Sequence, residues 1–209
     1  MRTVLVANRK GGCGKTVTAI TLAGALAATG ARVALADADR QKSALRWLKR
    51  RPAASRPIEP LDWTKKGAFG TAPKKTDWLV IDAPGAVSSE AAQTLIAEAR
   101  AVIVPVQPSV FDEDSTGRFL RDIDAIKRVR KGKTAIHLLA NRVRSGARAE
   151  AALASFFARL GAAPVAWIAE RAAYATLAEA GLSIFDVARK PERALQAQWQ
   201  PLLDRLGDG

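Results

Sequence analysis

The hydrophobic positions of this chain follow two patterns that alternate from one end to the other. Short apolar runs bounded by turn residues are typical of buried strands, and longer stretches with apolar residues three or four apart are typical of helices. Strands are expected at residues 3–7, 31–36, 77–82, 101–106, 134–140 and 165–168, and a short one is an option around Ile58. Helices are expected at residues 17–28, 42–50, 90–99, 115–130, 147–160, 172–180 and 192–206. The alternation predicts an α/β fold, with a doubly wound, mostly parallel sheet and helices on both faces.

The segments between these elements predict turns rather than a boundary between domains. Ser88 or Ser89 is expected to cap the helix that follows it. Residues 62–75 contain glycine, proline and several lysines, and are expected to form irregular surface with at most a short helix. No repeat or long linker divides the chain, so residues 1–209 are expected to form a single domain.

The most informative stretch connects the first expected strand to the first expected helix. It reads Asn8-Arg9-Lys10-Gly11-Gly12-Cys13-Gly14-Lys15-Thr16. A glycine-rich loop followed by Lys-Thr, between a strand and a helix, is the layout of a P-loop. The glycines let successive backbone N–H groups turn inward around phosphate oxygens, and the helix dipole favours the same anion. Lys15 is expected to reach the β- and γ-phosphates, and the Thr16 hydroxyl is expected to bind Mg²⁺.

Two residues distinguish this loop from the general P-loop. Arg9 stands where the general pattern has glycine, and Lys10 adds a second lysine. In this the chain resembles the deviant Walker A ATPases of the ParA/MinD family, which are P-loop NTPases. The resemblance implies ATP and Mg²⁺ as cofactors, ATPase activity, and a homodimer in which Lys10 reaches the partner's nucleotide; a solvated loop lysine is the alternative. The nucleotide-binding residues implied are Lys10, Gly11, Gly12, Cys13, Gly14, Lys15, Thr16 and Val17.

Three aspartates are expected beside the P-loop, because ligands of doubly wound sheets bind beyond the carboxyl ends of the strands. Asp82 ends an apolar run in a Walker B pattern, and Asp37 and Asp39 follow the second expected strand. The resemblance implies that Asp82 and Asp37 serve the Mg²⁺ shell and that Asp39 orients the attacking water. Asp39 can also cap the next helix, and the two roles can coexist. Arg40 departs from the family, which usually has proline there, so the hydrolysis rate and the rigidity of this switch stay open.

The sequence indicates the residues that would bind the nucleotide base less clearly than those that would bind its phosphates. Asn141 follows an expected strand, and in the family an asparagine at this point often reads adenine. The resemblance also implies that residues 168–174 close over the base, although Tyr174 can equally be ordinary packing. His137 is the sole histidine and lies within an apolar run, so it is expected to pack in the core rather than to act as a base or ligand.

The charge of the chain is unusual. There are 33 Lys and Arg residues against 20 Asp and Glu, which gives a formal net charge of +13. Such an excess favours an extended polyanion as partner, either nucleic acid or an anionic membrane surface, over a merely soluble basic protein. ParA-type proteins bind DNA non-specifically through basic residues near the dimer edge and the C-terminal helices. The residues implied here are Arg142, Arg144, Arg148, Arg189, Lys190 and Arg193, and for each of them a solvated surface position is the alternative.

The main hypothesis is an ATP-switched ATPase that dimerises, binds DNA and positions plasmid DNA, a chromosomal locus or a protein cargo. A ParB-like or cargo adaptor protein would stimulate its hydrolysis. A MinD-like membrane switch would need a basic amphipathic tail, whereas Pro201 and two aspartates interrupt residues 198–209, so no stable membrane binding is expected. A metabolic P-loop synthetase would need a substrate pocket, and an iron-protein relative would need cluster cysteines beyond Cys13, the sole cysteine. A cytoplasmic, nucleoid-associated protein is expected.

Overall fold

A parallel sheet forms the centre of the molecule. The structure, a computed structural model, describes residues 1–64, 70, 72–85, 90–144 and 146–208. Within these residues seven strands form one sheet in the order β3-β2-β4-β1-β5-β6-β7, and all neighbouring strands are parallel. The strands are β1 (Arg2–Val6), β2 (Val33–Asp37), β3 (Ile58–Asp62), β4 (Trp78–Asp82), β5 (Ala101–Val106), β6 (Ala135–Val143) and β7 (Ala166–Ala169). The predicted α/β fold with a doubly wound parallel sheet is confirmed.

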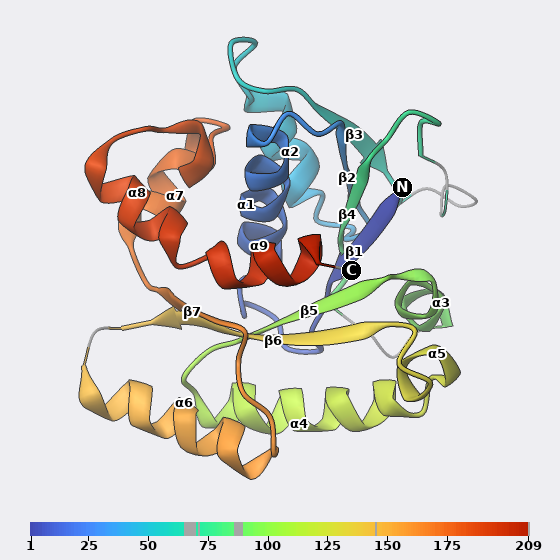
Figure 1. The fold of residues 1–209 in the computed structure, drawn as a ribbon, viewed down its shortest axis with the longest axis vertical. Helices are drawn as coiled ribbons and strands as arrows, with labels where there is room; N and C mark the ends of the chain where they lie inside the picture. Colours follow the sequence, from blue (N-terminus) through green and yellow to red (C-terminus); the bar gives the residue numbers. More distant parts are fainter. Residues whose placement is uncertain (65–69, 71, 86–89, 145, 209) are drawn as a thin grey trace.

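Helices cover both faces of this sheet (Figure 1). One face carries α1 (Lys15–Ala28), α2 (Ser43–Arg50), α7 (Ala172–Glu179), the 3₁₀ helix η1 (Ile184–Asp186), α8 (Lys190–Ala197) and α9 (Gln200–Gly207). The other face carries α3 (Glu90–Glu98), α4 (Val110–Asp124), α5 (Lys127–Arg130) and α6 (Ala147–Arg159). Each face has its own apolar core, and β2, β4 and β5 are buried along their whole length because side chains on both faces are covered.

The topology determines where a ligand can bind. From β1 the chain moves toward β3 on one side and later toward β7 on the other. The carboxyl end of β1 is therefore the topological switch point, where ligands of such sheets bind. The P-loop follows directly, and α1 begins at Lys15 against the sheet.

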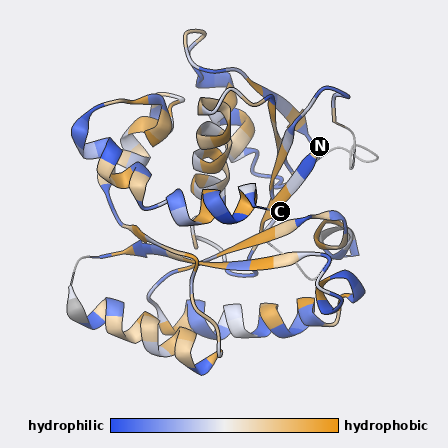
Figure 2. Ribbon diagram, viewed as in Figure 1, coloured by the Kyte–Doolittle hydropathy of each residue, from blue (hydrophilic) through white to orange (hydrophobic). Residues whose placement is uncertain are grey.

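Helix α1 is apolar almost all round because it is covered on several sides. It contacts β4 and β2 on the sheet, and η1 and α2 on its outer side. In Figure 2 its ribbon is mostly in the hydrophobic colours. At Gly24 an added Cβ atom would lie 2.2 Å from Oγ of Ser183, so only glycine allows the C-terminal segment to pack this closely. The first helix thus serves as a shared core element for the P-loop and the C-terminal segment.

The helix predicted at residues 115–130 is wrong in its extent. The structure has α4 from Val110 and a separate short α5, because Ile126 takes an extended backbone (φ −71°, ψ 122°) between them. Ile126 packs against the core of this face, so burial of its side chain favours the break. The earlier start places Asp112 in the first turn of α4, where the helix dipole favours a carboxylate.

The single C-terminal helix predicted at residues 192–206 is also wrong. The structure has α8 and α9, separated around Gln198, whose Oε1 accepts a hydrogen bond from the Ala169 N–H at 2.9 Å. Pro201 lies in the first turn of α9, where its missing N–H is not needed, and so marks a new helix start. The segment before α8 forms η1, which was not predicted and which Ser183 caps.

Two further predictions concern strands, and a third falls on residues that the structure does not describe. The optional strand around Ile58 exists as β3, an edge strand that tolerates Pro60. Strand β6 extends to Val143 rather than stopping at 140, so Asn141 lies within a strand and not after it. The predicted helix caps Ser88 and Ser89 lie outside the described residues.

Candidate nucleotide-binding site

The loop between β1 and α1 has a backbone that depends on glycine. Gly12 and Gly14 adopt left-handed conformations, with φ of 80° and 92°, which residues with side chains rarely adopt. A Cβ atom added at Gly14 would lie 2.4 Å from Nδ2 of Asn141, a clash that would displace one of them. At Gly11 and Gly12 an added Cβ would meet no atom within 4 Å, so this side of the loop is open. The loop curves around open space at the N-terminus of α1, which is the arrangement that receives a phosphate group.

The two lysines of the loop have different surroundings. Lys15 is buried, and its Nζ donates a hydrogen bond to the Lys10 carbonyl at 2.9 Å. The Cys13 thiol donates to the same carbonyl at 3.2 Å, and burial raises the pKa of that thiol. Lys10 is half-buried, and among the described residues all of its hydrogen bonds are made by its backbone. Lys15 therefore closes the loop on itself, whereas the Lys10 ammonium is left for another partner.

Asp112 is a buried acid beside this loop that the sequence analysis missed. It is 6% exposed, and its Oδ1 has no hydrogen-bond partner among the described residues. Burial raises the pKa of Asp112, while a hydrogen bond from Ser109 and the charges of Lys10, Arg142 and Lys15 act in the opposite direction. Both P-loop lysines thus act on one carboxylate. The predicted helix began after Asp112, so its place beside the loop could not be foreseen.

Asp37 and Asp39 hold the turn between β2 and α2. Asp37 Oδ1 accepts the Asp39 N–H and Oδ2 accepts the Leu45 N–H, each at 3.0 Å. Asp39 Oδ1 accepts the Gln41 N–H at 2.9 Å, but α2 begins only at Ser43 and its N-cap residue makes no side-chain capping hydrogen bond, so the predicted helix-capping role of Asp39 is wrong. The second oxygen of Asp39 can serve a water. Burial raises the pKa of Asp37 and its backbone hydrogen bonds oppose this rise. The predicted Mg²⁺ role of Asp37 stays a prediction, because the structure uses both its oxygens to position the turn.

Asp82 lies at the end of β4 and is the most unusual carboxylate of the site. It is 1% exposed, and neither of its oxygens has a hydrogen-bond partner among the described residues. Burial raises its pKa to about 7, although the nearby Thr16 hydroxyl and Lys15 ammonium lower it. A buried acid without partners costs stability unless a cation or hydrogen bonds compensate it. The residues present fit Mg²⁺, which proteins commonly bind through one or two carboxylates together with nucleotide phosphates and water.

A cavity of about 420 Å³ extends from the P-loop to the segment after β7. This volume is typical of a small-molecule site. The phosphate end is lined by Gly11, Gly12, Gly14, Lys15, Thr16, Val17, Asp39, Gln41 and Gly85, and the other end by Asn141, Arg142, Ile168, Ala169, Glu170, Arg171, Tyr174, Ala175 and Trp199. Predicted residues from distant parts of the sequence therefore share one cavity.

The far end of the cavity is built from side-chain contacts. Asn141 Nδ2 donates to the Cys13 carbonyl at 2.9 Å, so this residue supports the P-loop and leaves its Oδ1 for a ligand. Tyr174 accepts a hydrogen bond from Trp199 Nε1 at 2.9 Å, and burial raises the pKa of Tyr174 to about 12. Adenine reading by Asn141 and closure of residues 168–174 over the base stay predictions.

The sequence of the chain matches a known family over most of its length. The profile described as "CbiA: CobQ/CobB/MinD/ParA nucleotide binding domain" matches residues 4–184.

The chain belongs to this family.

The resemblance to the ParA/MinD family is thereby confirmed. The chain is 26% identical over 197 residues to the "Maintenance of carboxysome distribution protein A" of Halothiobacillus neapolitanus, covering 92% of this chain and 90% of that protein. It is 37% identical over 121 residues to the protein of the same description from Gloeobacter kilaueensis, covering 53% of this chain and 51% of that protein, so the match spans about half the length of each. A structure of a Cyanothece McdA variant in complex with ATP superimposes with a TM-score of 0.76 at 17% identity, covering 97% of this chain and 96% of that chain, which shows the shared fold.

The predicted DNA-binding residues of this ParA/MinD-family chain lie in two places. Arg142, Arg144 and Arg148 are exposed around the end of β6 and the start of α6, whereas Arg189, Lys190 and Arg193 are exposed at the start of α8. Three of them form ion pairs, which join Arg142 and Arg144 to Glu170 and Arg189 to Glu192. Arg142 also lines the nucleotide cavity. Their contact with DNA stays a prediction.

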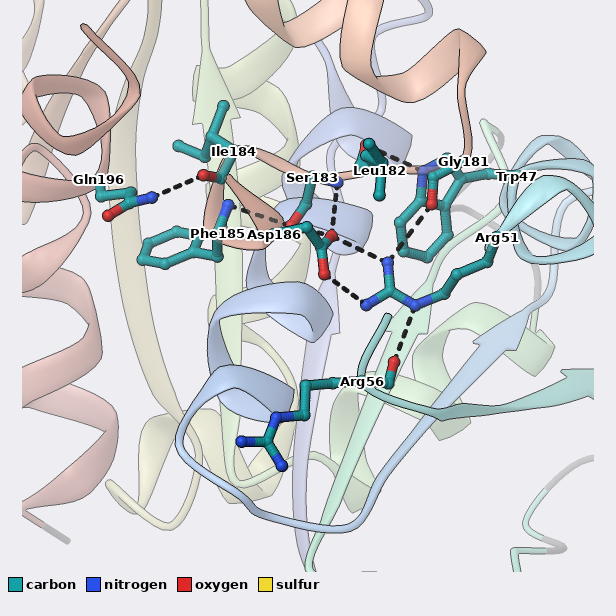
Figure 3. A network of polar contacts seen from close by, with 10 residues as sticks. All are labelled: Trp47, Arg51, Arg56, Gly181, Leu182, Ser183, Ile184, Phe185, Asp186 and Gln196. Carbon is teal, nitrogen blue, oxygen red and sulfur yellow. Dashed lines mark hydrogen bonds and ion pairs between the residues drawn. The ribbon is translucent and has the colours of Figure 1, made fainter. Parts of the chain in front are cut away.

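A second polar cluster was not predicted and holds the C-terminal segment on α2 (Figure 3). We call Trp47, Arg51, Gly181, Ser183 and Asp186 the C-terminal anchor. Arg51 donates to both oxygens of Asp186, at 2.9 and 2.7 Å. The Arg51 guanidinium carbon lies over the Trp47 ring, 5.1 Å from the ring centre. Ser183 donates to Asp186 from its backbone and its hydroxyl. The backbones approach so closely at Gly181 that an added Cβ would lie 2.3 Å from the Arg50 carbonyl carbon.

The anchor connects the two ends of the nucleotide cavity. Helix α2 begins just after the Asp37–Asp39 turn and ends at the anchor, and the chain reaches the anchor from α7, which carries Tyr174.

Among the described residues, no helix combines the length and the hydrophobicity that a membrane span needs.

Proposed function

We propose that this chain is an ATP-switched positioning ATPase that dimerises around ATP, binds DNA without sequence preference and hydrolyses ATP slowly until a partner protein stimulates it. Its membership of the ParA/MinD family and its likeness to a carboxysome distribution protein over nine-tenths of both sequences support the proposal. The cargo would be a protein assembly or a DNA locus. The adaptor would be a ParB-like or cargo-bound protein.

The Lys10 ammonium is the observation that carries the dimer part of this proposal. Lys10 directly precedes Gly11 and Gly12, where the loop is open, and within the described residues its side chain has no hydrogen-bonding or ion-pair partner. Lys15 already supplies one buried ammonium to the loop. A second copy of the chain that faces this side across two bound ATP molecules would give Lys10 a phosphate partner, which a charge-assisted hydrogen bond favours.

An exposed apolar pair beside the loop also favours dimerisation. Val110 and Phe111, at the start of α4, are 70% and 78% exposed, which is unusual for large apolar side chains. They lie next to the P-loop because the Gln107 side chain donates to the Gly12 carbonyl and Asn8 Nδ2 donates to Pro105 O and to Thr116 Oγ1 on α4. Burial of this pair against a second copy would add a hydrophobic contribution to the phosphate contacts.

Hydrolysis would use the acids that surround the phosphate end of the cavity. When bound, Mg²⁺ would neutralise phosphate charge, and Thr16 and Asp82 would hold it together with water. Asp39 keeps one carboxylate oxygen available beside the cavity, where it would orient a water for attack. Lys15 and Lys10 would stabilise charge on the phosphate oxygens.

The C-terminal segment favours DNA over a membrane as the polyanion. A MinD-like switch would expose an apolar helix face to lipid. Here Trp199, Leu202 and Leu206 are at most 3% exposed and belong to the core. The excess of 33 basic over 20 acidic residues then points to phosphate contacts with nucleic acid, which weaken steeply with salt.

DNA co-sedimentation with ATP, with ADP and without nucleotide, at two salt concentrations, tests this function. The proposal expects the chain to pellet with DNA of any sequence much more with ATP than with ADP or without nucleotide, and only at low salt. Lys15→Ala, which removes the buried P-loop ammonium, is expected to lose ATP binding and therefore DNA binding. The proposal would be contradicted if DNA binding did not depend on the nucleotide, or if the chain floated with anionic vesicles but did not pellet with DNA.

A further inference from the structure

Two of the basic residues predicted to touch DNA share one carboxylate within the chain. Glu170 follows β7, and its two oxygens accept hydrogen bonds from Arg142 Nη2 at 3.0 Å and from Arg144 Nε at 2.5 Å. The Glu170 N–H donates to the Val143 carbonyl at 2.9 Å, which keeps the segment after β7 beside the end of β6. One anion thus lies between two guanidinium groups. A phosphate group of DNA would bind two arginines in the same way.

The backbone at this point is specialised. The register between β6 and β7 shifts between Ala140 and Val143, and Arg142 takes a left-handed conformation with φ of 53°. Such a conformation is uncommon for a residue other than glycine, asparagine or aspartate, and strained residues gather at functional sites. Because Arg142 and Arg144 are two positions apart across this irregularity, both guanidinium groups reach the same carboxylate.

The cluster is exposed on its basic side. The side chains of Arg142 and Arg144 are 51% and 81% exposed, whereas that of Glu170 is 27% exposed. Arg171 adds a third guanidinium, which donates to the Glu170 carbonyl at 2.8 Å. Three guanidinium groups therefore contact a residue that carries a single negative charge, and the net positive charge attracts a further anion to this surface. Exposed ion pairs are weak, so a polyanion can displace the carboxylate.

The cluster is also part of the wall of the nucleotide cavity. Arg142, Glu170 and Arg171 line the same cavity as the P-loop. A nucleotide that fills the cavity would contact the segment that carries Glu170. The position of this carboxylate can therefore depend on whether the cavity is filled.

We propose that Glu170 is an internal competitor for DNA phosphate: its carboxylate occupies Arg142 and Arg144, and DNA binding at this place requires its displacement. The inference rests on the proposed function, because it names part of the DNA-binding surface and how that surface is regulated. Arg144 supplies the exposed phosphate contact, and Glu170 lowers DNA affinity most when the nucleotide cavity is empty. The acid thus restrains DNA binding outside the ATP state.

DNA affinity of the full chain, measured by fluorescence anisotropy with a labelled duplex of random sequence, tests this role. Affinity is compared for the wild type, Glu170→Gln and Glu59→Gln, without nucleotide and with saturating ATP. Glu59 is an exposed acid on β3, at the opposite edge of the sheet, so its variant makes the same change in net charge. We expect Glu170→Gln to bind DNA about three- to tenfold more tightly than Glu59→Gln without nucleotide, and to show a smaller difference with ATP.

Arg144→Ala shows whether the gain comes through this cluster. Arg144 is mostly exposed, so its replacement leaves the core intact. This variant is expected to bind DNA more weakly, with a salt dependence reduced by about one phosphate contact. In its presence Glu170→Gln is expected to raise DNA affinity by less than in the wild-type background, because Arg142 alone is then released.

Each outcome has a separate meaning. If wild-type protein with ATP does not bind DNA, the proposed function fails and this inference fails with it. If the wild type binds DNA with ATP but Glu170→Gln and Glu59→Gln agree within twofold without nucleotide, only the inference fails. A gain that is undiminished in the Arg144→Ala background, or one seen with anionic vesicles but not with DNA, would also overturn it.

Discussion

Two buried carboxylates of this molecule have opposite surroundings. Asp186, in the C-terminal anchor, accepts hydrogen bonds from Arg51 and Ser183, and the side chains of the Arg51–Asp186 pair are 6% and 8% exposed (Figure 3). Asp82, at the phosphate end of the cavity, is as deeply buried, and has no hydrogen-bond partner among the described residues. A satisfied buried acid joins parts of the fold. An unsatisfied one leaves capacity for a ligand and lowers stability until the ligand binds.

The pKa values express the same contrast. Burial raises the pKa of Asp186, but hydrogen bonds from Arg51 and Ser183 outweigh it and leave the pKa below its ordinary value. Burial raises the pKa of Asp82 to about 7, and no equivalent set of donors opposes it. The anchor thus stabilises the charged form of Asp186, whereas the nucleotide site disfavours the charged form of Asp82. Substitutions at the nucleotide site should therefore affect mainly ATP hydrolysis, and substitutions in the anchor mainly the free energy of unfolding.

The largest effect is expected from Asp82→Asn. Loss of the carboxylate should remove the protein's charged contact to Mg²⁺ and lower ATP hydrolysis by about 100-fold or more. Its free energy of unfolding, measured without metal by chemical denaturation at neutral pH, should be unchanged or higher, because a buried charge has been removed. Steady-state phosphate release measures the first effect. A variant that hydrolyses ATP normally but is less stable would reverse the assigned roles of Asp82 and Asp186.

Arg51→Ala should show the opposite behaviour. It would leave the Asp186 carboxylate buried without its main partner, so the free energy of unfolding should fall by about 3–5 kcal/mol. Arg56→Ala is the matched control, because the Arg56 carbonyl accepts from Arg51 while its side chain points away from the anchor (Figure 3). The control should change stability by less than about 0.5 kcal/mol. Equal losses in the two variants would show that the ion pair does not hold the C-terminal segment.

The pH dependence of stability should differ in sign between the two acids. The folded pKa of Asp82, about 7, lies above its ordinary value of 3.8, so its contribution to stability is present at low pH and is lost as the pH rises through this window. The folded pKa of Asp186 is lowered, so its contribution is present above the ordinary value and is lost as the pH falls through the folded pKa. Without metal, Asp82→Asn should gain stability relative to the wild type between pH 4 and 7, by a total on the order of 4 kcal/mol. The free energy of unfolding of Asp186→Asn should be lower than that of the wild type, and this difference should shrink as the pH falls. Parallel pH profiles of the two variants would contradict the comparison.

A smaller effect is expected from the neutral part of the anchor. Trp47 Nε1 donates to the Leu182 carbonyl at 3.2 Å, and Trp47→Phe removes this hydrogen bond while keeping an aromatic ring. The free energy of unfolding should fall by about 1–2 kcal/mol, less than for Arg51→Ala. A loss as large as that of Arg51→Ala would show that packing of Trp47, rather than the ion pair, dominates the anchor.

The phosphate end of the cavity was predictable because its residues lie close together in sequence. The residues from Gly11 to Thr16 form one continuous segment, a loop followed by the first residues of α1, and Asp82 directly ends an apolar strand, so local patterns indicate their place. The parallel sheet was predictable from the alternation of strands and helices.

The anchor and the Glu170 cluster depend on contacts that no local pattern encodes. Arg51 and Asp186 are 135 positions apart, and Arg142 and Glu170 are 28 apart. The left-handed backbone of Arg142 has no sequence signal, since glycine is the usual residue for it. The helix breaks at Ile126 and Gln198 were missed for a related reason, because core packing and a hydrogen bond to another element override the helical pattern there.

The central claim is that ATP joins two copies of this chain through Lys10. The most direct measurement is the molar mass in solution, by size-exclusion chromatography with light scattering, of wild type, Lys10→Ala and Arg9→Ala with ATP and Mg²⁺. Arg9 is the matched control because it is adjacent to Lys10 and carries the same charge. It is exposed, and its Nη1 lies 3.4 Å from Asp122 Oδ2. The wild type and Arg9→Ala should be dimers with ATP and monomers without it, whereas Lys10→Ala should bind ATP but stay monomeric. A Lys10→Ala variant that dimerises with ATP as the wild type does would contradict the claim.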